Sequence, residues 1–246
     1  MLINKLFSVK NKTVVITGCG TGIGFELAKG FILNEANVIG ISRRRPKENL
    51  NFSSFFECDI TIQNEIKKLA NQIRLDNTTI DVLINVAGVS ILKSSNLNEM
   101  SRFDKTLDTN LRAMYNLILE LKSQYISGSS IINFSSIAGH FGFPNNPSYC
   151  ASKGAVLSLS KALSYDLGSQ NIRVNCIMPG YFHTKMTAVS FSDEKEKKMR
   201  ENRTFLGRWG GLKELLGASI FLASDASSYV TGTELIVDGG WSAKGL

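Results

Sequence analysis

The chain has 246 residues, a formal net charge of +7 and 43% hydrophobic residues, which predicts a protein with a large apolar core. No apolar run approaches the ~18 residues of a membrane span, and the amino-terminal stretch lacks the apolar centre of a signal peptide. The four cysteines form no CxxC pair, and the basic residues are mostly scattered among acids. We therefore expect a cytoplasmic protein with reduced thiols, no metal site, no membrane partner and no nucleic-acid partner.

Strands and helices alternate along the chain. Short apolar runs predict strands at 13–17, 37–42, 54–58, 81–88, 130–135, 173–178 and 234–238. Apolar residues at helical spacing predict helices after the first strand, over 61–75, over 99–125, after Tyr149 and over 212–223, and a charged lid helix around 185–203. This alternation indicates one α/β domain, residues 1–246, with a doubly wound parallel sheet that has helices on both faces. Ligands bind such sheets at the carboxyl ends of the strands.

A glycine-rich turn, TGCGTGIG at 17–24, follows the first predicted strand. Glycines at 18, 22 and 24 allow a tight turn and a close approach of phosphate to the backbone. The spacing is Gly-x-x-x-Gly-x-Gly and not the GxGxxG fingerprint. Because the turn opens a helix, whose free N–H groups attract anions, we interpret it as the binding site for a dinucleotide pyrophosphate.

The residues after the second strand bear on the choice of cofactor. A carboxylate there would hold the ribose hydroxyls of NAD, but the strand ends at Ser42 and is followed by three arginines, Arg43 to Arg45, with no acid before Glu48. Arginine binds phosphate well, so Ser42 and Arg43 favour the 2′-phosphate of NADP(H). A solvated turn, with NAD(H) as the cofactor, is the alternative.

Three polar side chains meet around the loop from Ser135 to Lys153. Ser136 follows a strand, and Tyr149 begins a helix on which Lys153 lies one turn later, on the same face. A nearby ammonium favours the phenolate, so Lys153 is expected to lower the pKa of Tyr149. This arrangement suits a tyrosine that acts as acid and base, with Ser136 holding a substrate oxygen.

The chain resembles the short-chain dehydrogenase/reductase family over nearly its full length. The glycine turn, the Asn-x-Ala-Gly turn at 85–88, Ser136, Tyr149-x-x-x-Lys153 and Pro179-Gly180 occur in the family's order and spacing. The resemblance implies a Rossmann-type sheet of seven parallel strands and NAD(P)-dependent chemistry on ketones or alcohols. It also implies that Asn110 completes a catalytic tetrad with Ser136, Tyr149 and Lys153, by holding a water that relays protons to Lys153.

The same resemblance implies further cofactor contacts from Asp59 to adenine, from 85–88 to the adenosine ribose and from 179–184 to the carboxamide. Together with the glycine turn and the arginine cluster, the residues expected at the cofactor are Gly18, Thr21, Gly22, Ile23, Gly24, Ser42, Arg43, Asp59, Ile60, Asn85, Ala87, Gly88, Tyr149, Lys153, Pro179, Gly180, Phe182 and Thr184. One departure is Val86, where the family usually has a second Asn that ties the central strands together.

The sequence does not identify the substrate. The carboxyl-terminal stretch is similar to bacterial reductases of the acyl-carrier-protein and sugar-acid types, so a 3-oxoacyl thioester, a sugar-derived ketone or a small cyclic ketone all fit. Candidate pocket residues are Ser90, Ile91, Phe141, Phe143, Met186, Phe191 and Met199. Both histidines, His140 and His183, are expected to be loop residues without a catalytic role.

Apolar residues lie off the main stripe of the 99–125 helix and just before it, at Leu97, Ala113, Leu117 and Leu119. In the family that the chain resembles such helices pair across a two-fold axis, so the resemblance implies a homotetramer, with a dimer as the next choice. An NAD-dependent alcohol or sugar dehydrogenase and a non-catalytic dinucleotide sensor are the alternative functions.

Overall fold

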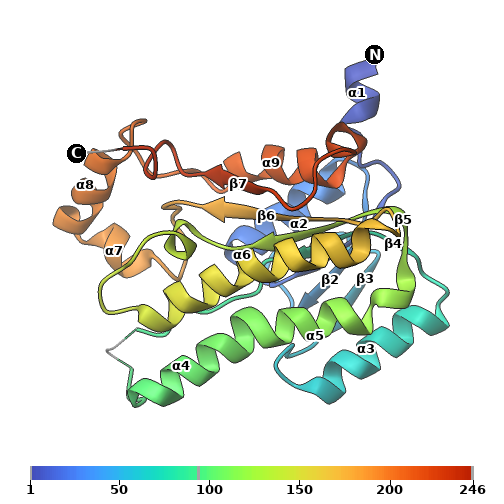
Figure 1. Ribbon diagram of the computed structural model, residues 1–246, viewed down its shortest axis with the longest axis horizontal. Helices are drawn as coiled ribbons and strands as arrows, with labels where there is room; N and C mark the ends of the chain where they lie inside the picture. Colours follow the sequence, from blue (N-terminus) through green and yellow to red (C-terminus); the bar gives the residue numbers. More distant parts are fainter. Residues whose placement is uncertain (1, 93–94, 245–246) are drawn as a thin grey trace.

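The computed structural model describes residues 2–92 and 95–244. Seven strands form one sheet in the order β3-β2-β1-β4-β5-β6-β7, and every pair is parallel (Figure 1). The strands are β1 Thr13–Thr17, β2 Asn37–Ser42, β3 Ser54–Glu57, β4 Ile80–Asn85, β5 Tyr125–Phe134, β6 Arg173–Pro179 and β7 Glu234–Val237. The strand order reverses between β1 and β4, so the predicted doubly wound α/β fold is confirmed.

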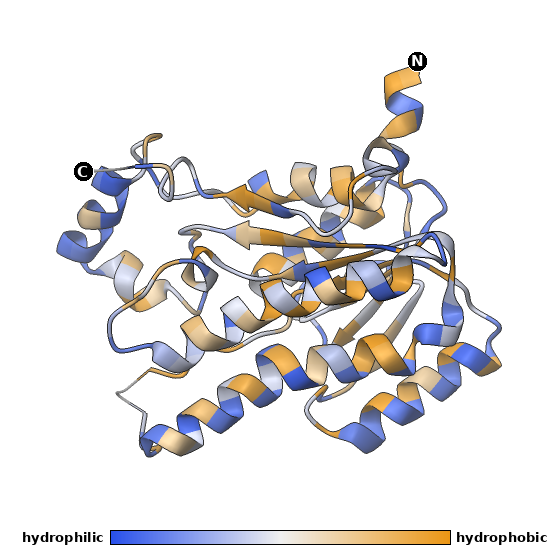
Figure 2. Cartoon of the chain, viewed as in Figure 1, coloured by the Kyte–Doolittle hydropathy of each residue, from blue (hydrophilic) through white to orange (hydrophobic). Residues whose placement is uncertain are grey.

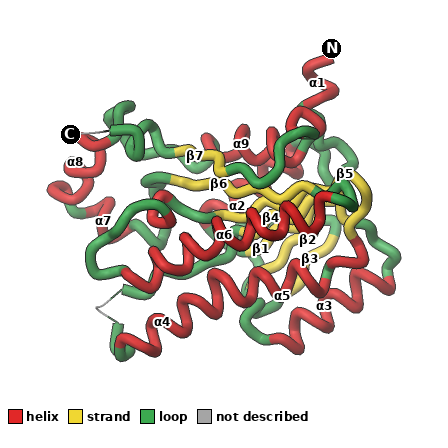
Figure 3. The backbone as a smooth tube through the Cα atoms, viewed as in Figure 1, coloured by secondary structure: helices red, strands yellow, loops and turns green. Residues whose placement is uncertain are grey.

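Helices cover both faces of the sheet (Figures 1 and 3). The α-helices are α1 Leu2–Leu6, α2 Gly22–Leu33, α3 Gln63–Leu75, α4 Glu99–Leu107, α5 Ala113–Glu120, α6 Pro147–Gly168, α7 Ala188–Ser192, α8 Glu194–Arg203 and α9 Glu214–Ala223. Shorter helical turns are η1 Asp108–Arg112, η2 Lys122–Gln124, η3 Ile137–Gly139 and η4 Asp225–Ser227. The small helix α1, which the sequence pattern did not predict, projects from the body.

Two apolar cores lie on opposite faces of the sheet. Val15 packs into the core under α3, α5 and α6, while Val14 and Ile16 pack into the core under α2 and α9. Because side chains alternate along a strand, a strand covered on both faces is apolar throughout, as the orange strands in Figure 2 show. The sheet therefore forms the rigid middle layer from which the loops at its edges project.

The segment predicted as one helix over 99–125 is interrupted. A π-helical turn, η1, separates α4 from α5, and α5 ends at Glu120. Tyr125 fits the helical spacing but begins β5, and its hydroxyl donates to the carbonyl of Ile118 at 3.3 Å. The charged lid segment is likewise two helices, α7 and α8, because Asp193 caps the second one through the backbone N–H of Glu196 at 3.0 Å.

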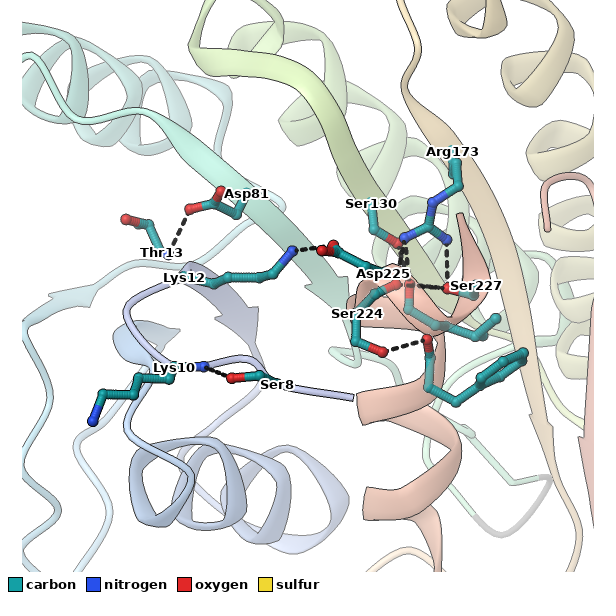
Figure 4. A network of polar contacts seen from close by, with 12 residues as sticks. Ser8, Lys10, Lys12, Thr13, Asp81, Ser130, Arg173, Ser224, Asp225 and Ser227 are labelled. Carbon is teal, nitrogen blue, oxygen red and sulfur yellow. Dashed lines mark hydrogen bonds and ion pairs between the residues drawn. The ribbon is translucent and has the colours of Figure 1, made fainter. Parts of the chain in front are cut away.

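Paired polar side chains hold the amino ends of the strands together (Figure 4). Lys12, just before β1, pairs with Asp225 at 3.0 Å. Arg173, the first residue of β6, donates to Ser227 Oγ at 2.8 Å and to the carbonyl of Leu222 at 2.9 Å, which satisfies buried groups at the end of α9. Burial lowers the pKa of Arg173. The polar side chains at the amino ends of the strands therefore stabilise the fold.

Strands β4 and β5 are also tied by a buried pair of amides. Asn85 Nδ2 donates to Asn133 Oδ1 at 2.9 Å, and Asn133 donates in turn to Ser160 Oγ at 2.8 Å on α6. Val86, which replaces the amide usual in the family, packs against the apolar core on the α2 side. The link between the central strands is therefore made by Asn85 in this chain.

Candidate active site

A cavity of about 700 Å³ opens at the carboxyl ends of β1, β2, β4, β5 and β6. Eighteen of the residues predicted for the site line it: Gly18, Thr21, Gly22, Ile23, Gly24, Ser42, Arg43, Asp59, Ile60, Ala87, Gly88, Ser136, Tyr149, Lys153, Pro179, Gly180, Phe182 and Thr184. Segments far apart in the sequence thus meet at one edge of the sheet, with α7 and α8 beyond it (Figure 1).

The glycine turn is built as a cradle. Gly18 and Gly22 have φ of 71° and 62°, in the left-handed region that favours glycine. A Cβ on Gly24 would lie 2.5 Å from the carbonyl oxygen of Gly18, so only glycine lets α2 start this close to β1. Thr21 precedes α2 without a side-chain cap, and the first turn of the helix has no acid. The N–H groups at this helix end are therefore available to an anion.

Arg43 and Arg45, in the arginine cluster at 43–45, have different surroundings. Arg43 is exposed and lines the cavity beside Ser42. Arg45 instead places its guanidinium 4.7 Å from the ring centre of Phe55 on β3. A Cβ on Gly20 would lie 2.6 Å from Ser42 Oγ, so a fourth glycine brings the phosphate turn against the end of β2. Arg43 is therefore the arginine placed to read a group bound at this end of the cavity.

Ser136, Tyr149 and Lys153 meet at the other end of the cavity. Ser136 caps η3 by accepting from the N–H of Ala138 at 3.1 Å, and its hydroxyl hydrogen-bonds the half-buried phenol of Tyr149. Lys153 is buried, its Nζ lies 5.7 Å from the centre of the Tyr149 ring, and it donates to the carbonyl of Phe134 at 2.7 Å. The three residues predicted to act together therefore form one group.

The electrostatics of this group differ from the expectation. Burial raises the pKa of Tyr149, and the hydrogen bond from Ser136 only partly opposes that rise. Burial also lowers the pKa of Lys153 to about 8, so its charge is lost as the pH rises just above neutral. The expected lowering of the Tyr149 pKa by Lys153 is therefore wrong for this structure, because burial disfavours both charged forms.

Asn110 lies outside the cavity lining and binds the backbone of Val89, which does line the cavity. It lies in the π-helical turn η1, is buried, and does not line the cavity. Its Oδ1 accepts from Val89 N–H at 2.7 Å, and its Nδ2 donates to Val89 O at 2.9 Å and to Ser152 Oγ at 3.0 Å. A Cβ on Gly88 would lie 3.2 Å from Asn110 Oδ1 and 3.6 Å from Lys153 Nζ, so both polar groups converge on this glycine.

Asn85 is the other predicted site residue that does not reach the cavity. Its side chain is directed into the sheet toward Asn133, so its amide points away from the cavity in which the cofactor ribose is expected. The physical reason is the buried amide pairing described above, which places the amide within the sheet layer. Asn85 is therefore a positioning residue for the turn that follows β4.

Several lining residues were not predicted, among them Ile41, Cys58, Thr61, Val86, Val89, Lys105, Asp108, Thr109, Phe134, Ser135, Lys185 and Thr187. Lys105, Asp108 and Thr109 reach the cavity from the end of α4 and from η1, an interruption that apolar spacing does not reveal. Lys185 could have been found, because it lies between Thr184 and Met186 on the segment that follows β6.

The residues expected at the substrate pocket are divided between the cavity lining and the loops around the cavity. Ile91 and Met186 line the cavity, whereas Ser90, Phe141, Phe143, Phe191 and Met199 do not. Phe141 and Phe143 pack on Trp241, with ring centres 5.5 Å away in each case. Ser90 accepts a hydrogen bond from Asn146 Nδ2 at 2.7 Å. These side chains support the loops around the cavity and do not line it.

The two histidines lie outside the cavity lining. His140 Nε2 lies 2.7 Å from a carboxylate oxygen of Glu234, and His183 stacks on Phe191 with ring centres 4.0 Å apart. Over residues 2–92 and 95–244, no three His, Cys, Asp or Glu side chains are grouped so that they could hold a metal ion. In the same described part of the chain, every helix is too short or too polar to cross a membrane.

Comparisons with known proteins agree with this geometry. A family model described as enoyl-(acyl carrier protein) reductase matches residues 18–242. The chain is 37% identical to the 3-oxoacyl-[acyl-carrier-protein] reductase of Chlamydia trachomatis over 244 residues, which cover 94% of this chain and 97% of that protein. It is 34% identical to the gluconate 5-dehydrogenase of Gluconobacter oxydans over 249 residues, or 96% of each chain.

A solved structure gives the same result. The gluconate 5-dehydrogenase of Burkholderia cenocepacia, in complex with NADP and tartrate, superposes with a TM-score of 0.89 at 28% identity, over 99% of this chain and 100% of that one. The sequence motifs, the sheet order and these relatives agree over nearly the whole length. The chain therefore belongs to the short-chain dehydrogenase/reductase family of nicotinamide-dependent oxidoreductases.

Proposed function

We propose that this protein is an NADP-dependent oxidoreductase that reduces a ketone to a secondary alcohol. The observation that carries the proposal is that one cavity holds an uncapped helix end and Arg43, and also Ser136, Tyr149 and Lys153. The first set suits the phosphates of a dinucleotide, and the second suits proton transfer to an oxygen.

The residues present fit NADP(H). The cradle of Gly18, Gly22 and Gly24 would hold the diphosphate, with N–H groups of α2 as donors. Arg43 would take the 2′-phosphate, and Thr184 faces Gly22 from the opposite wall. The cofactor supplies the hydride when it is bound. Two solved gluconate 5-dehydrogenases of the same fold contain NADP, which supports this choice, whereas a solved 4-hydroxyisoleucine dehydrogenase of the same fold contains NADH.

The chain's own residues would handle the substrate oxygen and its proton. The Ser136 hydroxyl would orient the ketone oxygen toward the phenol of Tyr149, which gives up its proton to that oxygen. Since the pKa of Lys153 is about 8, its ammonium can return a proton to Tyr149 near neutral pH. Asn110 would hold the turn at Gly88 and Val89 in place, and its proposed relay water would connect Lys153 to solvent.

The experiment is a pair of titrations followed by an activity assay. Tyr149→Phe is expected to bind NADPH with unchanged affinity, measured by cofactor fluorescence, and to lose turnover on every ketone tested. Full turnover in this variant would refute the mechanism. Arg43→Ala is expected to weaken NADPH binding and leave NADH binding unchanged. Preference of the wild type for NADH would instead favour an NAD-dependent alcohol or sugar dehydrogenase, and absence of turnover with tight binding would favour a sensor.

The substrate class follows from a screen of three ketone types: 3-oxoacyl thioesters, sugar-derived ketones and small cyclic ketones. Relatives named for the first two types match with comparable identity, which supports testing both. The four free cysteines support a cytoplasmic location.

We also propose a homotetramer, although the expected apolar excess on the 99–125 segment is smaller than the sequence suggested. Ala113 and Leu117 are buried within the chain, while Tyr115 and Leu119 stay exposed at 39% and 46%. Light scattering of the purified protein measures the assembly directly.

A further inference from the structure

The segment from Thr184 to Thr187 forms a fixed turn across the cavity from the glycine cradle. All four of its residues line the cavity. Thr184 N–H donates to Thr187 Oγ1 at 2.9 Å, and Thr187 Oγ1 donates to the carbonyl of Phe182 at 2.6 Å. A Cβ on Gly22 would lie 3.9 Å from the Thr184 side chain, so the turn faces the start of α2 at contact distance. Lys185 follows Thr184 directly and lines the same cavity as the helix end proposed to bind phosphate.

Lys185 carries a positive charge that the described residues leave without an ion pair. Of the acids that line the cavity, Asp108 pairs with Arg112 at 2.9 Å, and Asp59 accepts from Thr61 N–H at 3.0 Å. Between Pro179 and Ser192 the chain contains no acid at all. An exposed lysine with no acidic neighbour, on the wall of a cavity, is placed to meet an anion brought by a ligand.

We propose that Lys185 is a cofactor-binding residue that pairs with the diphosphate of the dinucleotide. This inference rests on the proposed function. The N–H groups of α2 would hold the diphosphate from one side, and the Lys185 ammonium would neutralise it from the other. Arg43 is assigned to the 2′-phosphate, which only NADP carries, whereas the diphosphate is common to NAD and NADP. The two cations therefore have separable effects.

The test measures dissociation constants for NADPH and NADH by fluorescence in the wild type, Lys185→Met, Lys185→Glu and Arg43→Ala. Lys185→Met keeps the aliphatic stem and removes the charge. It is expected to weaken both nucleotides by the same factor, about tenfold, with a larger loss in Lys185→Glu. Added salt should weaken wild-type binding more than binding to Lys185→Met. The matched control is Lys67→Met, an exposed lysine on α3 that does not line the cavity, and it should change neither constant.

Other outcomes overturn the proposal. Unchanged constants in Lys185→Met would show that the ammonium does not reach the cofactor, and weaker binding of NADPH alone would place it at the 2′-phosphate. The anion could instead belong to the substrate. In that case Lys185→Met would raise the KM for a ketone that carries a carboxylate, while the KM for a neutral ketone and the dissociation constants of both nucleotides would stay unchanged. If the wild type binds neither nucleotide, the proposed function fails as well, which separates that failure from one confined to Lys185.

Discussion

The burial of Lys153 predicts how the stability of the folded protein depends on pH, which can be tested without a substrate. The Lys153 side chain is buried and donates a hydrogen bond to the carbonyl of Phe134. Its pKa falls from 10.5 to about 8 on folding. Because the unfolded chain then binds the proton more tightly than the folded one, the stability of the folded protein rises with pH between about 8 and 10.5. The full shift corresponds to a cost of about 3 kcal/mol at pH 7.

The comparison of wild type with Lys153→Met isolates this effect, since all other groups titrate in both proteins. The free energy of unfolding, from urea titrations followed by Trp209 and Trp241 fluorescence without cofactor, is measured at pH 7 and at pH 9.5. The wild type should gain about 2 kcal/mol relative to the variant over this range. A constant difference, or a relative loss by the wild type, would show that Lys153 is a stable cation in the folded protein. In that case the expected lowering of the Tyr149 pKa would be restored.

Two further predictions concern the two edges of the sheet. Arg173→Met should lower the free energy of unfolding, measured in urea, by about 3 kcal/mol, because the buried carbonyls of Leu222 and Ser224 each lose a donor. The NADPH affinity should stay unchanged. A loss of stability below ~1 kcal/mol would contradict this account. Gly24→Ala should weaken NADPH binding more than tenfold, because the new Cβ would lie 2.5 Å from the oxygen of Gly18. Gly217→Ala on α9, where nothing lies within 4 Å, is the control and should bind NADPH like the wild type.

The fold could be predicted from the sequence because its strands are covered on both faces. Val14, Val15 and Ile16 all have an apolar environment, so the strand appears as a continuous apolar run, and its length of five residues before a glycine-rich turn distinguishes it from a helix. The glycine turn was predictable for a related reason. Gly18 has a φ of 71°, and a Cβ on Gly24 would lie 2.5 Å from the carbonyl oxygen of Gly18, so both requirements for glycine arise within the turn itself.

The interruption of the 99–125 segment could not be predicted in this way. A π-helical turn changes the phase of the helix by an extra residue per turn, but the apolar residues on either side still recur at spacings of three or four. Asn110 lies in that turn and binds the backbone of Val89 from there, and the family resemblance, not helical spacing, pointed to it. Tyr125 is similar: its ring fits an apolar stripe, but its backbone belongs to β5.

The direction of the pKa shifts of Tyr149 and Lys153 could not be predicted from the sequence either. Spacing of four residues placed Lys153 beside Tyr149, and that proximity is present. The depth of burial, however, depends on the walls that α4, β5 and η1 build around the pair. In a buried site the cost of desolvating an ammonium and a phenolate can exceed their attraction. A motif therefore fixes which groups meet, and the surrounding packing decides their protonation.

The two edges of the sheet differ in how their polar groups are satisfied, and this difference explains where function resides. At the amino ends, Lys12, Asp225 and Arg173 find their partners within the chain, which stabilises the folded state and leaves little for a ligand to gain. At the carboxyl ends, the first N–H groups of α2 have no side-chain cap, and Arg43 and Lys185 have no acidic partner among the described residues. Arg43 and Lys185 are exposed, so water hydrates them in the free protein and an anion can replace that water. A ligand that supplies phosphates would bind both the helix end and the two cations, so the groups that have no partner within the chain would be the source of affinity at the carboxyl ends of the strands.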